Sequence, residues 1–204
     1  MRRLAVALII AIGLPLASAS ITSADTTDST TYGSGNFGYC NYGSCTITLT
    51  SSGTVNVNVA PTPGGRCTVQ SDNPSVLTDS TAGYSLTMTT STTNNAMTGS
   101  SGSIPTSSGT SASPVVLAAN TWGYRVDGLA SFGAGPTSPI SSGSSPSVTF
   151  AGVPASNQAP TPVASSSGPA NPAVGTTVWY GVCANSSLAS GSYTTTVTYT
   201  AVTN

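Results

Sequence analysis

The sequence contains no histidine, lysine or glutamate, and it has few charges of either sign. Charged residues are 4% of the 204-residue chain, whereas an average globular protein has about 25%. The Ser-His-Asp, Cys-His and Ser-Lys arrangements that activate a nucleophile each need one of the missing side chains, so these arrangements are excluded. Nucleic-acid binding is also excluded, because it needs several cations on one face.

Long hydrophobic runs are scarce too, and the single one lies at the front of the chain. Residues 4–16 are apolar, follow Arg2 and Arg3, and precede Ala17-Ser18-Ala19. This three-part layout is typical of a secretory signal and predicts cleavage after Ala19. The run is shorter than the roughly 20 residues that a membrane-spanning helix needs. We therefore predict a signal peptide at residues 1–19 and a secreted or extracellular, surface-associated mature chain without a membrane span.

The predicted mature chain carries very little charge. Removal of 19 of 204 residues leaves 185, whose ionisable side chains are Arg66, Arg125 and five aspartates, at positions 25, 28, 72, 79 and 127. Hydrophobic residues are 38% of the chain, which favours a folded core over disorder. We predict one domain at 45–204, preceded by a Ser-, Thr- and Gly-rich lead-in at 20–44.

Four cysteines are present, and an exported chain is expected to oxidise them. Cys40 and Cys45 flank the short segment NYGS and can close a small ring, which leaves Cys67 to pair with Cys183. We favour this arrangement among the three that four cysteines allow. The long-range bridge is worth about 4–5 kcal/mol in the chain-entropy description. Paired CxxC spacing is absent, so no zinc or other metal site is predicted.

Apolar residues alternate with polar ones along most of the chain, which predicts strands. Residues 45–61 read as a hairpin that turns at Ser52-Gly53, and further strands are expected at 67–70, 83–91, 120–128, 148–153, 176–184 and 191–204. Residues 94–114 are expected to be mainly a loop with room for a short pairing segment, and residues 155–172 are expected to be a second loop. We predict an all-β, antiparallel, immunoglobulin-like sandwich of seven to nine strands with long Ser-, Pro- and Gly-rich loops.

Three aromatic residues are candidate ligand contacts. Trp122 and Tyr124 alternate with polar residues, and such large rings usually fill a sandwich core. Trp179 lies on the face opposite Val178 and Tyr180, so it either points outward to a sugar or another protein or packs between strands. Sugar stacking and core packing both remain open for these residues.

The aspartates offer the one acid–base chemistry that the composition allows. A glycosidase needs two carboxylates across one cleft, but Asp72, Asp79 and Asp127 lie near Gly or Asn-Pro and favour roles in turns. A calcium site built from Asp72, Asn73 and Asp79 would lack the dense oxygen ligands of a dedicated loop. Arg125 and Asp127 are two apart and are expected to form an exposed ion pair. We predict no catalytic residues, no cofactor and no enzyme.

Two segments resemble exported bacterial proteins. NSSLASGSYTTTVTYTA, with Leu188, Gly191 and Tyr193, resembles the closing strand of bacterial immunoglobulin-like surface domains. AANTWGYRVDG, with Trp122, is similar to the Trp-centred strands of the WxL group, although neither Trp122 nor Trp179 has the Leu two residues later that marks the group. The resemblance implies a secreted bacterial cell-surface sandwich, and WxL members attach non-covalently to the wall.

These observations together predict a non-catalytic surface protein with a structural or adhesive role. One alternative is a carbohydrate- or cell-wall-binding module that uses Trp179, and its partner would be a glycan or a wall polymer. Another is a subunit of a surface polymer, in which the terminal strand at 191–204 pairs with a neighbouring protein. The ligand and the oligomeric state stay open.

Overall fold

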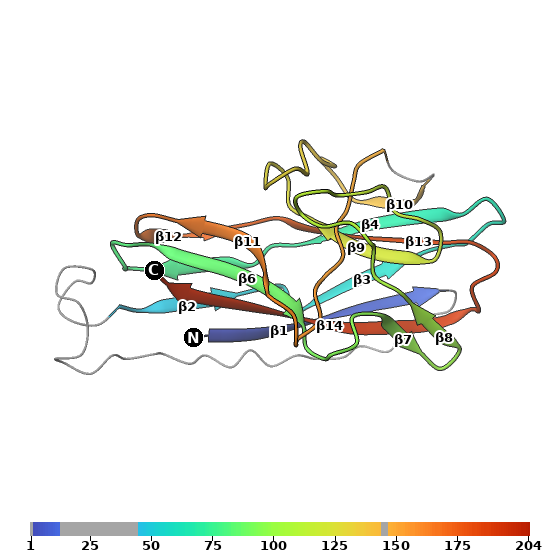
Figure 1. Cartoon of the computed structure of the whole chain (residues 1–204), viewed down its shortest axis with the longest axis horizontal. Helices are drawn as coiled ribbons and strands as arrows, with labels where there is room; N and C mark the ends of the chain where they lie inside the picture. Colours follow the sequence, from blue (N-terminus) through green and yellow to red (C-terminus); the bar gives the residue numbers. More distant parts are fainter. Residues whose placement is uncertain (1, 13–44, 144–146) are drawn as a thin grey trace.

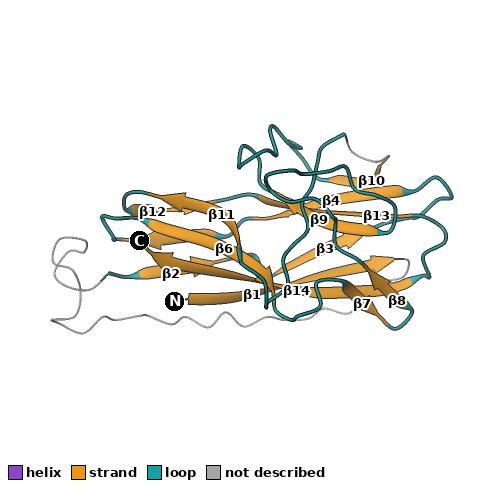
Figure 2. Cartoon of the chain, in the orientation of Figure 1, coloured by secondary structure: helices purple, strands orange, loops and turns teal. Residues whose placement is uncertain are grey.

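The computed structural model describes residues 2–12, 45–143 and 147–204. These residues form strands and no helix, as Figure 2 shows. The strands are β1 (Arg2–Ile12), β2 (Ile47–Thr50), β3 (Thr54–Asn58), β4 (Arg66–Asp72), β5 (Ser75–Thr78), β6 (Tyr84–Thr90), β7 (Met97–Gly99), β8 (Gly102–Ile104), β9 (Thr121–Arg125), β10 (Ile140–Gly143), β11 (Thr161–Ser166), β12 (Ala170–Gly175), β13 (Val178–Ala184) and β14 (Gly191–Thr203).

The strands form three sheets in a sandwich-like arrangement (Figure 1). The largest has the order β11-β6-β14-β1-β3, and the β7–β8 hairpin joins it through β14. A second sheet has the order β10-β4-β13-β9, and a third has the order β12-β5-β2. Among the described strands, every ladder is antiparallel except that between β1 and β3. The predicted all-β class and antiparallel pairing are thus confirmed, with more strands than predicted.

The main core draws residues from all three sheets, including the large sheet, β13 with β9, and β2 and β5 of the third sheet. In β6 and β14 the alternating residues predicted to face inward are buried, including Leu86, Met88, Val197 and Tyr199. The two sheets meet at a hydrogen bond of 2.7 Å between the hydroxyl oxygens of Tyr180, on β13, and Tyr199, on β14. Each phenol therefore keeps a polar partner inside an apolar interior.

Strand β13 is buried along its whole length and on both faces. Val178, Tyr180 and Val182 belong to the main core, whereas Trp179 and Cys183 belong to a second cluster with Cys67, Val69, Leu117 and Phe150. Phe150 reaches this face because Gly181 and Gly123, which are level with each other on β13 and β9, carry no side chains. A Cβ at Gly181 would come within 2.7 Å of the Phe150 ring.

The predicted hairpin at 45–61 is wrong in its pairing. Both strands form near the predicted positions, but β2 pairs with β5 and β3 pairs with β1, in different sheets. The reason is the turn between them, where the buried carboxylate of Asp72 accepts hydrogen bonds from the backbone N–H of Ser52 and from the hydroxyls of Ser51 and Ser52. This clamp fixes a corner at which the chain changes sheet.

The predicted loops also contain strands. Residues 94–114 carry the β7–β8 hairpin, which corresponds to the short pairing segment expected in this mainly irregular stretch. Residues 155–172 contain β11 and the start of β12, which were not predicted. Both strands lie at sheet edges, where Pro162 and Pro172 are tolerated because an edge strand has N–H groups without a ladder partner. The strand expected at 148–153 is reduced to isolated bridges at Phe150 and Ala151.

Substitution of Gly181 tests the packing of Phe150 over β13. We expect Gly181→Ala to lower the free energy of unfolding by about 1–3 kcal/mol, because the added methyl group overpacks the ring. Gly175→Ala is the matched control, since no heavy atom lies within 4 Å of its Cβ position, and it should change stability by no more than about 0.5 kcal/mol. Denaturant unfolding of the oxidised proteins measures both, and equal effects would contradict the packing.

The tyrosine pair predicts loss of stability at high pH. Burial raises the pKa of Tyr180 and of Tyr199 above the ordinary value of 10.0. Above that pH the unfolded chain releases protons that the folded chain keeps, so the free energy of unfolding falls as pH rises. Each phenol contributes a slope of about 1.4 kcal/mol per pH unit. The double variant Tyr180→Phe, Tyr199→Phe should flatten the decline by up to about 2.7 kcal/mol per pH unit, and an unchanged slope in unfolding curves would refute this account.

Candidate functional site

The segment predicted as a signal sequence occupies a central place in the large sheet. It forms β1, which lies between β14 and β3 (Figure 1). Arg2 is level with Ala201 and Ile12 with Gly191, so β1 runs antiparallel to β14 over residues 191–201. Residues 7–11 run parallel to residues 54–58 of β3. Cleavage after Ala19 stays a prediction, and residues 13–44, which include that position, the lead-in and Cys40, lie outside the described residues.

Strand β3 belongs to the large sheet through β1, its ladder partner there. Its Val55 and Val57 are nevertheless buried in the main core. The register places position 8 level with Val55 and position 10 level with Val57, while positions 4 and 6 are level with the buried Tyr199 and Val197. We name the space between β3 (Thr54–Asn58) and residues 191–201 of β14 the β3–β14 lane, and it is the strongest candidate site in the described part of the chain.

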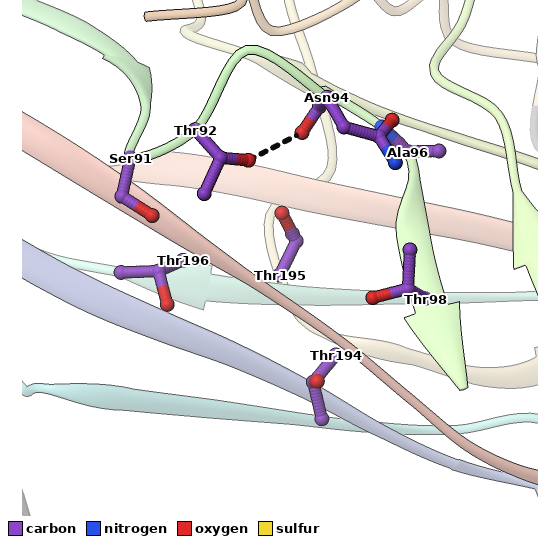
Figure 3. A pocket seen from close by; sticks show the side chains of 8 residues that line it. All are labelled: Ser91, Thr92, Asn94, Ala96, Thr98, Thr194, Thr195 and Thr196. Carbon is purple, nitrogen blue, oxygen red and sulfur yellow. Dashed lines mark hydrogen bonds between the residues drawn. The ribbon is translucent and has the colours of Figure 1, made fainter. Parts of the chain in front are cut away.

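A hydroxyl-lined hollow of about 210 Å³ lies on the other side of β14. Figure 3 shows the side chains around it, which come from β14, from β7 and from the connection between β6 and β7. They are Ser91, Thr92, Asn94, Ala96, Thr98, Thr194, Thr195 and Thr196. Hydroxyls suit sugar hydroxyls, but no aromatic ring lines the hollow, so it lacks the stacking platform expected of a carbohydrate site.

The three candidate aromatic contacts are buried. Trp122 and Tyr124 have no exposed surface, and Trp179 is 6% exposed. The Trp122 indole donates to the carbonyl of Asn95 at 3.1 Å, and the Tyr124 hydroxyl lies 2.6 Å from that of Thr161. Trp179 does face away from the main core, as the alternation indicates, but the second cluster covers it. Ligand contact by these rings stays a prediction, and their burial does not favour it.

Arg125 is a buried anchor rather than part of an exposed pair. Its side chain is 0% exposed, and that of Asp127 is 35% exposed. The guanidinium donates from Nε to Asp127 at 2.7 Å and from its other nitrogens to the carbonyls of Phe132, Gly133 and Thr149. The second oxygen of Asp127 accepts from the Trp179 indole at 3.1 Å. The predicted pair forms, but loops cover its Arg125 end while Asp127 stays partly exposed, and the pair ties those loops to β9 and β13.

The other two described carboxylates also bind backbone. Asp72 holds the β2–β3 corner and accepts from the N–H of Asn73 at 2.9 Å, while Asp79 accepts from the N–H of Thr46 at 2.7 Å. Of these bonds only the one from Asn73 to Asp72 is the local turn contact that the sequence favours, whereas the others join segments far apart in the chain. Within the described residues, no three His, Cys, Asp or Glu side chains gather as metal ligands. The carboxylates thus order the chain at separate points.

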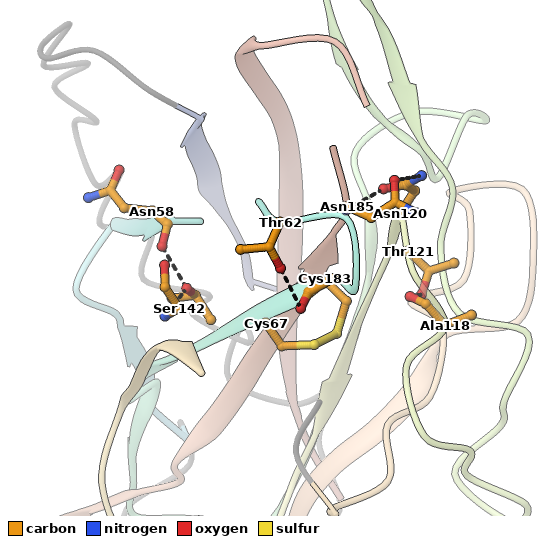
Figure 4. Close-up of a disulfide and its surroundings, with 11 residues drawn as sticks. Asn58, Thr62, Cys67, Ala118, Asn120, Thr121, Ser142, Cys183 and Asn185 are labelled. Carbon is orange, nitrogen blue, oxygen red and sulfur yellow. Dashed lines mark hydrogen bonds between the residues drawn. A yellow bond between two sulfur atoms is a disulfide. The ribbon is translucent and has the colours of Figure 1, made fainter. Parts of the chain in front are cut away.

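One disulfide joins Cys67 of β4 to Cys183 of β13 (Figure 4), and this predicted pair is confirmed. The two residues are level in neighbouring strands, with a sequence separation of 116. Cys45 is also disulfide-bonded, but its predicted partner Cys40 lies outside the described residues. Near the bridge, Asn120 and Asn185 exchange two hydrogen bonds of 3.0 and 3.1 Å.

Comparisons with protein-family models, with curated proteins and with solved structures find no match to this chain. No helix in the described part of the chain is long and apolar enough to span a membrane.

The structural role of Asp72 is open to a direct test. We expect Asp72→Ala to lower the free energy of unfolding by about 1.5–3 kcal/mol, because the corner loses several charge-assisted hydrogen bonds at once. Asp79→Ala is the control, since that carboxylate holds one backbone N–H, and it should cost about 1 kcal/mol. Thermal or denaturant unfolding distinguishes the two, and a neutral Asp72→Ala would contradict the clamp.

Proposed function

We propose that the chain is an exported, non-catalytic, immunoglobulin-like sandwich that serves as a structural or adhesive element of a bacterial surface. The proposal rests on the contacts of the ionisable side chains. Asp72 and Asp79 accept hydrogen bonds from backbone N–H groups, and Arg125 donates to Asp127 and to a backbone carbonyl. Catalysis needs a carboxylate aimed at a substrate. A scaffold needs carboxylates that order turns.

The closing segment supports the immunoglobulin-like part of the proposal. The hydroxyl of Tyr193 donates to the carbonyl of Ala189, four residues earlier, at 2.7 Å, and Leu188 packs against the main core. Immunoglobulin-type sandwiches use a similar tyrosine corner, in which the phenol bonds to backbone a few residues upstream. The residues that carry the family resemblance therefore have a physical role in starting β14.

A surface role is also consistent with the chain's polar groups. Hydroxyls and amides tie distant segments together, as where Thr68 donates to the carbonyl of Asn58 and accepts from the N–H of Ser142. Such bonds involve few titrating groups, so they change little with salt or pH outside the cell.

Trypsin resistance tests this proposal on the protein isolated from its producing cells. Trypsin cuts after arginine, but Arg125 is buried and Arg66 lies in β4 next to the disulfide. We expect the oxidised protein to stay intact and the reduced protein to be cut at least about a hundredfold faster, since the bridge is worth about 4–5 kcal/mol. Mass spectrometry of fragments gives the rates, and the Cys67→Ala, Cys183→Ala variant is the control.

Fractionation of the same cells completes the test. The proposal predicts the protein in the envelope or surface fraction, with Ser20 at its N-terminus. Rapid fragmentation of the oxidised form, or a purely cytoplasmic protein that starts at Met1, would contradict the proposed role.

A second candidate, a subunit assembled by strand pairing, is favoured by one observation. A partner would have to pair with β14. This strand lies next to β1, which is the segment that export would remove.

A further inference from the structure

We propose that export opens the β3–β14 lane and that the lane accepts an extended segment of a different exported polypeptide. The inference rests on the proposed function, because removal of residues 1–19 takes β1 away. It goes beyond that function in naming the binding site and the chemistry of its partner.

The backbone supplies the first argument. Neighbouring strands lie about 4.8 Å apart, so removal of a strand from between two others leaves a gap of about 10 Å, wide enough for one strand. In the large sheet, the described ladder partner of β3 is β1. Residues 191–201 of β14 also pair with β1 on this side. Removal of β1 leaves N–H and C=O groups unpaired along two facing edges. An added strand satisfies such groups.

The core supplies the second argument. Val55, Val57, Tyr193, Val197 and Tyr199 border the lane and are buried against the opposite sheet. Each of them is level with one of positions 4, 6, 8 and 10 of β1. A segment that fills the lane must therefore carry apolar residues at alternate positions, and it must run antiparallel to β14 and parallel to β3. These requirements define the partner's chemistry.

The lead-in of this chain does not meet those requirements. Residues 20–44 contain Ile21 as their one aliphatic residue larger than alanine, and of their aromatic residues only Phe37 and Tyr39 are at alternate positions, with Gly35 and Asn41 on either side of the pair. The other described strands already have ladder partners in the three sheets. The donor is accordingly a different polypeptide rather than a second copy.

The test uses residues 20–204, oxidised, and the full chain 1–204. The probe is a peptide of residues 2–12 with three added C-terminal lysines for solubility. We expect one equivalent to bind 20–204, to raise its melting temperature, and to slow amide exchange in β3 and residues 191–201 by about tenfold or more. The full chain should not respond, because β1 fills its lane. The edge strand β11 is the internal control and should exchange at an unchanged rate.

Two substituted peptides test which face of the donor strand contributes to binding. Serine at positions 4, 6, 8 and 10 replaces Leu4, Val6, Leu8 and Ile10 and should weaken binding at least about a hundredfold, because the peptide would then lack the alternating apolar residues that the lane requires. Serine at positions 5, 7, 9 and 11 replaces Ala5, Ala7, Ile9 and Ala11 and should weaken binding far less. Equal effects of the two peptides would overturn the proposed register.

A second protein keeps the test decisive if 20–204 does not fold alone. Arg2 is level with Ala201, near the end of β14, so residues 2–12 can be joined after Asn204 through a four-residue turn and enter the lane as a hairpin. We expect this protein to be a folded monomer that ignores the peptide. Folding of this form but not of 20–204 supports the lane, and failure of both forms overturns it.

Other results also overturn the proposal. They are slow exchange across the lane in 20–204 without peptide, protection at β11 in place of the lane, and self-association of 20–204 that protects the lane. None of these affects the trypsin and fractionation results on the cell-derived protein. Failure of the lane and failure of the surface role are thus distinguishable.

Discussion

The fold depends on β13, a strand buried on both faces. One face joins the main core, where the Tyr180 hydroxyl meets that of Tyr199. The other face is closed by Phe150 and Leu117 and carries the disulfide to β4. A strand buried on both faces requires covering layers on each side, and the loops that provide the outer layer are held by Arg125 through Phe132, Gly133 and Thr149.

The small number of charged side chains limits the chemistry that the described residues can support. With so few ionisable groups, each described carboxylate orders a turn or a loop, and hydroxyls form many of the remaining polar contacts. This distribution is compatible with the scaffold role that we propose. The proposed binding at the β3–β14 lane would depend on backbone hydrogen bonds and apolar packing, which need no charge.

Sequence reasoning succeeded where burial follows local alternation. The inward residues of β6 and β14, and the Cys67–Cys183 pair, were predicted because spacing of two and the short Cys40–Cys45 interval are local signals. It failed for the hairpin at 45–61, because Asp72, distant in sequence, turns the chain into another sheet. It also missed β11, since proline and serine do not indicate a strand, although an edge position permits them.

The sequence by itself determined the all-β class, the inward faces of the long strands and the chemistry that the missing side chains exclude, because composition and period-two spacing act within a few residues. Only the tertiary structure decided that Trp179 and Arg125 are covered, that β2 and β3 part, and that the apolar front segment fits between β3 and β14. Each of these depends on segments far apart in the chain, and local spacing carries no information about which distant segment covers or pairs with a strand.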